Sequence, residues 1–484
     1  MLFNSIDFLI FLPIVFALYW LASSKNIRLQ NIILIIASYV FYGWWDWRFL
    51  SLILISTVVD YTIGRFLDKT HNQTGRRLLL FTSITVNLGL LGFFKYYNFF
   101  VDSFVQAFTF FGFELSTRGL DIILPVGISF YTFQTLSYTI DIYRRKLHAD
   151  REFLSVCAFV SFFPQLVAGP IERATHLLHQ FDVERKFSYT HAVDGMRQIL
   201  WGFFKKIVIA DNCAIYANMI FNGSADLSGG VLLLGAIFFA FQIYGDFSGY
   251  SDIAIGTARL FGFELRRNFA YPYFSRDISE FWRRWHISLS SWFRDYVYIP
   301  LGGSRVGQAK KIRNVFVIFL VSGFWHGANW TFIIWGALHA LYYIPILLAD
   351  KNREYIEIVA KDKLLPTFKE FTQMSITFLL VVLAWVFFRA ENMTHAISYL
   401  STIFSVKLFD PFVMDQFYQA MGTLLLVSAF MCVEWLGRDR DHPLAKVDVI
   451  SSRSIRWIVY LGVMLSIYMF GNYSSSLEFI YFQF

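Results

Sequence analysis

The chain has 484 residues, of which 56% are hydrophobic and only 16% are charged, and it contains 56 Phe, 26 Tyr and 14 Trp. Soluble proteins usually hold about 25% charged residues, so this composition excludes an ordinary soluble domain and indicates an integral membrane protein. The net charge of +7 does not indicate nucleic-acid binding, because the basic residues collect in short loops of the kind that face the cytoplasm.

Long apolar runs recur along the whole chain. They cover residues 8–22, 78–94, 231–247, 315–324, 331–348, 376–388 and 458–470. About 20 helical residues cross a bilayer core of about 30 Å, and these runs are apolar on all sides, whereas the strands of a membrane barrel alternate. We therefore expect an all-α polytopic membrane protein with roughly ten to twelve membrane segments, some of them broken or re-entrant. The first run is expected to be retained, since no basic segment precedes it and further membrane segments follow.

A single integral membrane domain over residues 1–484 is expected, because no large polar domain or low-complexity tract interrupts the apolar runs. Its motifs lie within residues 120–350, and helices of less characteristic sequence occupy residues 370–484. Three cysteines lie far apart in apolar surroundings. We expect them to be small buried hydrophobic residues and not a disulfide framework.

Two polar patches interrupt the runs ahead of the main motifs. LPVGISFY at 124–131 places Pro125 and Gly127 where a helix would start or bend. YGDFSGYSD at 244–252 holds two carboxylates, two serines and two glycines at membrane depth, which predicts a helix break lining a cavity. An ordinary polar turn between two helices explains this second patch nearly as well.

The most charged motif is SEFWRRWHISLSSWFRDYVYIPLGGSR at 279–305, with one histidine and four arginines. A helix over 279–297 would carry one apolar stripe, formed by Phe281, Trp285, Leu289, Trp292 and Tyr296. The segment has too many charges to face lipid, so we expect it to line a polar cavity or to lie at the membrane interface. In the interfacial alternative, its arginines would bind lipid headgroups.

A second motif, WHGAN at 325–329, interrupts the apolar run of 315–348. If Arg313 marks the cytoplasmic surface, His326 lies about 20 Å deeper at the helical rise. An intramembrane histidine is a functional-site candidate, although a histidine that fixes helix packing is the alternative. His339 would lie about another 20 Å along a straight helix, so we expect it to be a packing residue.

Several common site signals are missing from the sequence. Neither a G-x-x-x-x-G-K-[ST] phosphate loop nor a G-x-S-x-G nucleophile elbow occurs, so ATP hydrolysis and that type of serine catalysis are not supported. His176 and His179 have helical spacing without a third ligand nearby, and no metal site is expected.

Taken in order, these motifs resemble the membrane-bound O-acyltransferase superfamily, and most of all its bacterial branch of alginate O-acetyltransferase-like polysaccharide acetylases. The resemblance runs through LPVGISFY (124–131), FPQLVAGP (163–170), YGDFSGY (244–250), FWRRWHISLS (281–290), WFRDY (292–296) and WHGAN (325–329). It covers most of residues 1–350 and continues more weakly through AWVFFRA at 384–390.

The resemblance implies a ring of tilted helices around a passage that joins the two membrane faces. It implies that His326 is the essential catalytic residue and that His286 lines the same passage. The donor would be acetyl-CoA or another acyl thioester arriving from the cytoplasm, with no tightly bound cofactor. The acyl group would leave on the outer face of the bacterial inner membrane, towards a polysaccharide, its assembly proteins or a periplasmic acyltransferase.

The residue types suit this chemistry, because a neutral imidazole with an unperturbed pKa near 6.5 can take a proton from an attacking hydroxyl. We expect Trp325 and Trp285 to exclude bulk water, and Asn329 or Ser290 to orient an imidazole or to bond the developing oxyanion. The other residues expected to line the passage are Arg283, Arg284 and Asp246.

Three alternatives stay open from the sequence alone. A D-alanyl-type cell-wall acyl transfer would use the same residues on another acyl group. A proton-coupled transporter of a small polar solute would use the histidines as a proton relay, and a non-enzymatic scaffold would tolerate the loss of both.

Overall fold

The computed structural model describes residues 1–21, 26–112, 119–150, 152–472 and 479–480. Every regular element within these ranges is helical. The chain forms two compact units: Met1–Gly195 with Thr257–Arg266, and Met196–Gly256 with Arg267–Phe484. The sequence-based expectation of one membrane domain over residues 1–484 stays a prediction.

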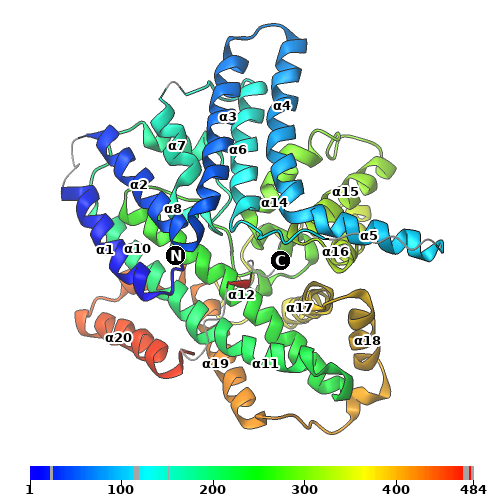
Figure 1. Cartoon of the computed structure of the whole chain (residues 1–484). Coiled ribbons are helices and arrows are strands. Elements are labelled where there is room, and N and C mark those ends of the chain that lie inside the picture. Colours follow the sequence, from blue (N-terminus) through cyan, green and yellow to red (C-terminus); the bar gives the residue numbers. More distant parts are fainter. Residues whose placement is uncertain (22–25, 113–118, 151, 473–478, 481–484) are drawn as a thin grey trace. The chain divides into compact units, whose positions relative to one another are not determined.

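The first unit holds the helices of the amino-terminal part of the chain (Figure 1). They are α1 (Ile6–Leu21), α2 (Ile27–Asp46), α3 (Leu50–Lys69), α4 (Gln73–Leu91), α5 (Tyr97–Phe110), α6 (Ile128–Tyr143), α7 (Phe153–Ser161), α8 (Phe163–Leu166), α9 (Ala174–Leu177) and the first part of α10 (Tyr189–Phe203), which continues into the second unit from Met196. Helices α3, α4 and α6 pack side by side. Their buried contact is polar: Ser83 donates to Asp60 at 2.6 Å and Asn87 donates to Asp60 at 2.8 Å.

Helix α6 begins where the LPVGISFY motif predicts a start. Gly127 precedes it with φ of 75°, a left-handed conformation that favours glycine. A Cβ atom at this position would lie 2.7 Å from the carbonyl oxygen of Leu166. The glycine therefore permits both the turn and a close backbone approach, and the expected helix start is confirmed.

The second unit holds α11 to α20. Their bounds are α11 (Asp211–Asn222), α12 (Gly229–Leu260, shared with the first unit), α13 (Ile278–Arg284), α14 (Ile287–Phe293), α15 (Gln308–His326), α16 (Trp330–Leu348), α17 (Phe368–Arg389), α18 (Met393–Ile403), α19 (Phe417–Gly437) and α20 (Arg453–Phe470). Helices α15 and α16 form a tight hairpin around the WHGAN motif (Figure 1). A Cβ at Gly323 would clash with the carbonyl of Phe332, and one at Gly336 with the carbonyl of Phe319, so the two glycines allow the close pairing.

Seven helical stretches in the described residues are long and apolar enough to cross a membrane, judged by length and composition. They are Ile27–Lys69, Gln73–Phe110, Gly229–Leu260, Trp330–Leu348, Phe368–Arg389, Phe417–Gly437 and Arg453–Phe470. The first two contain internal breaks, and α1 is a shorter apolar helix. The expected all-α polytopic membrane architecture is thereby confirmed.

The expected helix break at residues 244–252 was wrong, because α12 runs through this patch without interruption. Its glycines serve packing: Cβ atoms at Gly245 and Gly249 would lie 2.9 Å and 2.8 Å from the carbonyl oxygens of Lys205 and Gly202. Its two carboxylates are neutralised by lysines of that same neighbouring segment. Close packing and ion pairing thus account for a polar pattern that resembled a break.

Candidate functional site

The helix predicted over residues 279–297 is broken at its centre, so the single apolar stripe was a wrong expectation. Helix α13 ends at Arg284, and His286 has φ of 43° and ψ of 54° before α14 begins at Ile287. The segment just ahead of α13 supplies partners for the broken backbone. Ala270 N–H donates to the carbonyl of Arg284, and Ile287 N–H donates to the carbonyl of Asn268, both at 2.9 Å. The break places His286 at a corner between two short helices.

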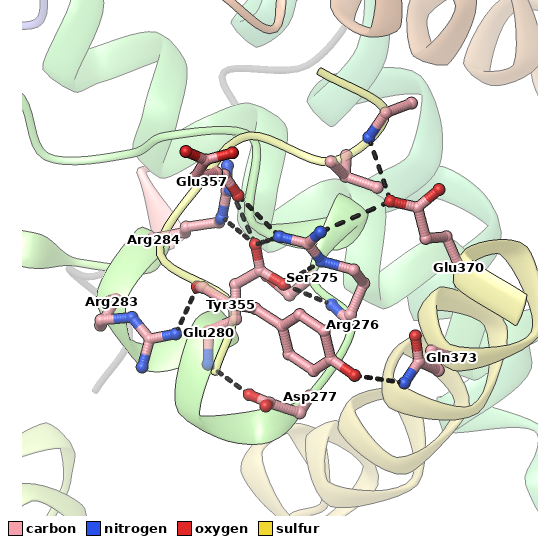
Figure 2. A network of polar contacts seen from close by, with 12 residues as sticks. Ser275, Arg276, Asp277, Glu280, Arg283, Arg284, Tyr355, Glu357, Glu370 and Gln373 are labelled. Carbon is pink, nitrogen blue, oxygen red and sulfur yellow. Dashed lines mark hydrogen bonds and ion pairs between the residues drawn. The ribbon is translucent and has the colours of Figure 1, made fainter. Parts of the chain in front are cut away.

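The charges of this motif are held by one another. Glu280, whose side chain is 1% exposed, accepts from Arg284 at 2.7 Å and from Arg276 at 3.0 Å (Figure 2). Arg276 also reaches Glu370 of α17 at 3.5 Å. One buried carboxylate therefore binds two guanidinium groups and fixes α13 next to α17.

The loop between α16 and α17 is seated on this network mainly through its backbone oxygens. Arg283 donates to the carbonyl of Asn352 at 2.6 Å. It also donates to the carbonyl of Tyr355 at 2.7 Å, and Arg276 donates to the carbonyl of Glu357 at 2.6 Å (Figure 2). Further along the loop, Arg438, which directly follows α19, donates to the carbonyls of residues 359, 360 and 363. The contacts of Arg283 and Arg284 are thus with protein groups, and their passage-lining role stays a prediction.

His286 is fully buried. Its Nδ1 lies 3.1 Å from Oδ1 of Asn268, and its ring packs edge-on against Phe247 with centroids 4.6 Å apart. It lies outside the seven candidate membrane spans. Burial lowers the pKa of His286 to about 3, so its imidazole is neutral near pH 7.

His326 is the last residue of α15 and is also buried. Its ring meets the rings of Trp325, Trp335 and Phe388 at centroid distances of 4.9, 5.2 and 5.3 Å. The ring of His286 lies 6.4 Å away, and Trp325 is also 6.1 Å from His286. The structure therefore brings the two motif histidines together inside an aromatic enclosure, with Trp325 against both.

The family assignment follows from a match over most of the chain. Residues 32–384, which include both histidines, match the model of the membrane-bound O-acyltransferase family. The chain belongs to this family. It is accordingly an acyltransferase with several membrane-crossing helices, and the transporter and scaffold alternatives are not supported.

Three relatives illustrate the range of known proteins that this acyltransferase resembles. A protein named probable alginate O-acetylase from Pseudomonas putida is 39% identical, with 100% of each chain covered. A peptidoglycan O-acetyltransferase from Helicobacter pylori is 33% identical over 100% of this chain and 98% of its own. A teichoic acid D-alanyltransferase from Bacillus subtilis is 30% identical over 46% of this chain and 58% of its own.

Two of the other expected site residues, Trp285 and Ser290, lie close to His286 in the chain, whereas Asn329 and Asp246 are held in a helix cap and an ion pair. Trp285 is buried in an aromatic cluster with Phe269 and Trp385, at 5.0 and 5.1 Å, and Ser290 donates to the carbonyl of Trp285 at 3.3 Å. Asn329 instead caps α16: its Oδ1 accepts from Thr331 N–H at 3.1 Å, and its Nδ2 donates to the carbonyl of Glu391 at 2.9 Å. Asp246 pairs with Lys206 at 2.8 Å and accepts from Ile480 N–H at 2.7 Å.

His339 packs as expected, although the hairpin brings it much closer to His326 than a straight helix would. Its Nδ1 accepts from the indole N–H of Trp282 at 3.3 Å. Its ring is 4.9 Å from Trp335, the same side chain that meets His326. Trp335 thus connects the two histidines of the hairpin.

Sequence reasoning missed the paired lysines Lys205 and Lys206, although two lysines inside an apolar run are a signal that carboxylates must lie nearby. Both lie in a short π-helical segment, Phe204–Ala210. Lys205 pairs with Asp252 at 3.0 Å and Glu434 at 3.2 Å, and Lys206 pairs with Asp211 and Asp246, each at 2.8 Å. Asn268 was also missed, and no motif in the sequence marks it.

Proposed function

We propose that this acyltransferase moves an acetyl group from a cytoplasmic thioester, with acetyl-CoA as the donor, towards a polysaccharide outside the bacterial cytoplasmic membrane. His326 and His286 are the proposed catalytic pair. The approach of their two buried rings to 6.4 Å is the observation that carries this proposal. The full-length likeness to a probable alginate O-acetylase and a peptidoglycan O-acetyltransferase supports acetyl transfer to a glycan.

The proposed reaction needs a base but no external energy source. The hydroxyl oxygen of the acceptor attacks the thioester carbonyl carbon, so that a C–O bond forms and the C–S bond breaks. The hydroxyl proton passes to an imidazole and then to the departing thiolate. A positioned general base contributes about 10²–10⁴-fold in rate, and the aromatic enclosure adds water exclusion. Trp325 is the supporting residue that the geometry favours, because its ring contacts both histidines.

Purified protein in lipid nanodiscs, given [¹⁴C]acetyl-CoA and a soluble glycan acceptor, tests the proposal. Wild type is expected to form labelled glycan and free thiol, and His326→Ala and His286→Ala are expected to lose about 10²-fold or more. His191→Ala, which changes an exposed histidine, is the matched control and keeps wild-type activity. Full activity in folded His326→Ala would refute the catalytic assignment.

The D-alanyl alternative rests on the partial likeness to the Bacillus subtilis protein. The same nanodiscs given a D-alanyl thioester separate the two acyl groups. Transfer of acetyl without D-alanyl supports the proposal, and the reverse result replaces it. On the outer side, we propose that the acetyl group passes to the polysaccharide with its assembly proteins, or to a periplasmic acyltransferase.

A further inference from the structure

Asn268 binds three consecutive residues at the corner that carries His286. It is fully buried, in the segment between α12 and α13. Its carbonyl oxygen accepts from Ile287 N–H at 2.9 Å. Its side-chain Oδ1 lies 3.1 Å from His286 Nδ1, and it accepts from Ser288 Oγ at 2.9 Å and from Ser288 N–H at 3.3 Å. One residue thus holds the backbone and the side chains of the whole corner.

The backbone N–H of Ser288 settles which end of the amide faces the histidine. That N–H can only donate, so the amide atom in front of it is the acceptor Oδ1 and not the donor Nδ2. The far end of the amide agrees, because Asn268 Nδ2 donates to Ser251 Oγ on α12 at 3.1 Å. A serine hydroxyl can accept as well as donate, so this contact is compatible with the orientation, and the N–H of Ser288 determines it.

The orientation of the amide determines the tautomer of His286. An oxygen without hydrogen at 3.1 Å requires a proton on the facing ring nitrogen, so the proton of the neutral imidazole is on Nδ1. The second nitrogen, Nε2, then carries the lone pair. A neutral histidine in this form accepts a proton or a hydrogen bond at Nε2.

The same contacts support an unusual backbone. His286 has φ of 43°, in a left-handed region that residues other than glycine rarely adopt unless their surroundings enforce it. The bonds from Ile287 and Ser288 to Asn268 fix the residues that follow, and the pair between Ala270 N–H and the Arg284 carbonyl fixes the chain just before. Asn268 therefore determines both where the ring points and which nitrogen is protonated.

We propose that Asn268 is a positioning residue: it holds His286 in the left-handed corner with the proton on Nδ1, so that Nε2 is the proton acceptor in acyl transfer. The proposal rests on the proposed function for its catalytic half. An aspartate would also accept from Nδ1, but it would add a negative charge and lose the donor to Ser251. The amide serves all of these contacts without adding charge.

The tautomer is measured on full-length wild-type protein in nanodiscs with ¹⁵N-labelled histidine. The His286 signals are assigned by their loss in His286→Gln. The expected spectrum shows a protonated Nδ1 and an unprotonated Nε2. A protonated Nε2 in wild type would overturn the inference whether or not acetyl transfer is found, so this arm is independent of the proposed function.

The kinetic arm uses Asn268→Leu, which removes the acceptor at similar volume, and Asn268→Asp, which keeps it. Asn268→Leu is expected to lower kcat about 10–100-fold, by analogy with the loss of partners that orient metal-bound histidines, with KM unchanged and with a mixed tautomer. Asn268→Asp is expected to restore the Nδ1-protonated form. Asn314→Leu, at a buried asparagine of α15 that bonds the carbonyls of Leu301 and Gly303, is the matched control.

The outcomes separate the two proposals. Wild type that transfers acetyl, together with folded Asn268→Leu of unchanged kcat and unchanged tautomer, would refute the positioning role alone. Wild type that transfers no acyl group would refute the proposed function, while the spectrum would still decide the tautomer. If Asn268→Leu does not fold, the wild-type and Asn268→Asp spectra decide the inference.

Discussion

Glu280 accepts a hydrogen bond from Arg284, one helical turn later, at 2.7 Å, and both side chains are almost fully buried. Arg276 uses the same carboxylate oxygen. The charges of the motif therefore stabilise the end of α13, and with it the position of His286 at the corner that follows. The contribution of these ion pairs to stability can therefore be tested by substitution, as can the roles of the histidines.

Glu280→Gln should destabilise the protein strongly. The substitution leaves Arg284 without its counter-charge and leaves Arg276 with only the longer pair to Glu370 at 3.5 Å among the described residues. Breaking a buried ion pair from one side costs about 3–5 kcal/mol. The measurement is the thermal midpoint in nanodiscs. Glu357→Gln is the matched control, because the Glu357 side chain is largely exposed and pairs with Lys361 at 3.3 Å, while its backbone carbonyl, which Arg276 binds, is unchanged by the substitution. It should change stability by about 0.5 kcal/mol or less, and equal effects of the two variants would contradict the assignment.

Lys205→Met should be more damaging than the double variant Lys205→Met/Glu434→Gln. The single change leaves Asp252 and Glu434 as buried carboxylates without their shared ammonium group, at a cost of about 3–5 kcal/mol. Neutralising Glu434 as well removes part of that penalty, so a double-mutant cycle should show a coupling energy of about 0.5–3 kcal/mol. Additive effects of the two changes would show that the ion pair does not form.

Gly249→Ala should lower the free energy of unfolding by about 1–3 kcal/mol, as overpacking of a tight contact does. The added Cβ would lie 2.8 Å from the carbonyl of Gly202, within a backbone approach that cannot yield cheaply. Gly462→Ala in α20 is the control, since a Cβ there meets nothing within 4 Å. Thermal unfolding of the two variants, side by side, distinguishes the close helix contact from the general effect of alanine.

Acidification should destabilise the wild type through His286. Its pKa is lowered to about 3 in the folded protein, against about 6.5 when unfolded. Below pH 6.5 the unfolded state therefore binds the proton more readily, and stability falls as the pH falls, by at most about 1.4 kcal/mol per pH unit. Thermal midpoints between pH 7 and 4.5 should fall less in His286→Gln than in wild type. The same slope in both proteins would show that His286 does not titrate in this way.

The sequence predicted the class of fold well because membrane helices are defined by composition and length, which are local properties. It also marked His326 as a candidate, because ionisable residues in apolar runs are costly and therefore informative. His286 entered through the family resemblance, and the catalytic roles of both histidines stay predictions. It did not predict the break at His286. That break depends on a hydrogen bond that the carbonyl of Asn268 accepts and on one that Ala270 N–H donates. A period-3.6 pattern carries no information about partners from another segment.

The continuity of α12 was missed for a related reason. Gly245, Gly249 and the two aspartates indicate a break when only α12 is considered. Lys205 and Lys206 become their partners only after folding. In the same way, Asn329 looked like a candidate to orient an imidazole, and the structure uses it as a helix cap. A sequence motif therefore shows that a polar residue has some structural or functional task more reliably than it shows which task.

The contacts that hold the α16–α17 loop determine which of its residues can be substituted. Its partners Arg276, Arg283 and Arg438 hold it by carbonyl oxygens of residues 352, 355, 357, 359, 360 and 363. Every amino acid presents the same carbonyl group, so side chains along this stretch can be exchanged while the hydrogen bonds from the three arginines are kept. Diversity over generations should therefore accumulate in the loop, and the three arginines that hold it should resist replacement even by lysine, which lacks their planar fork.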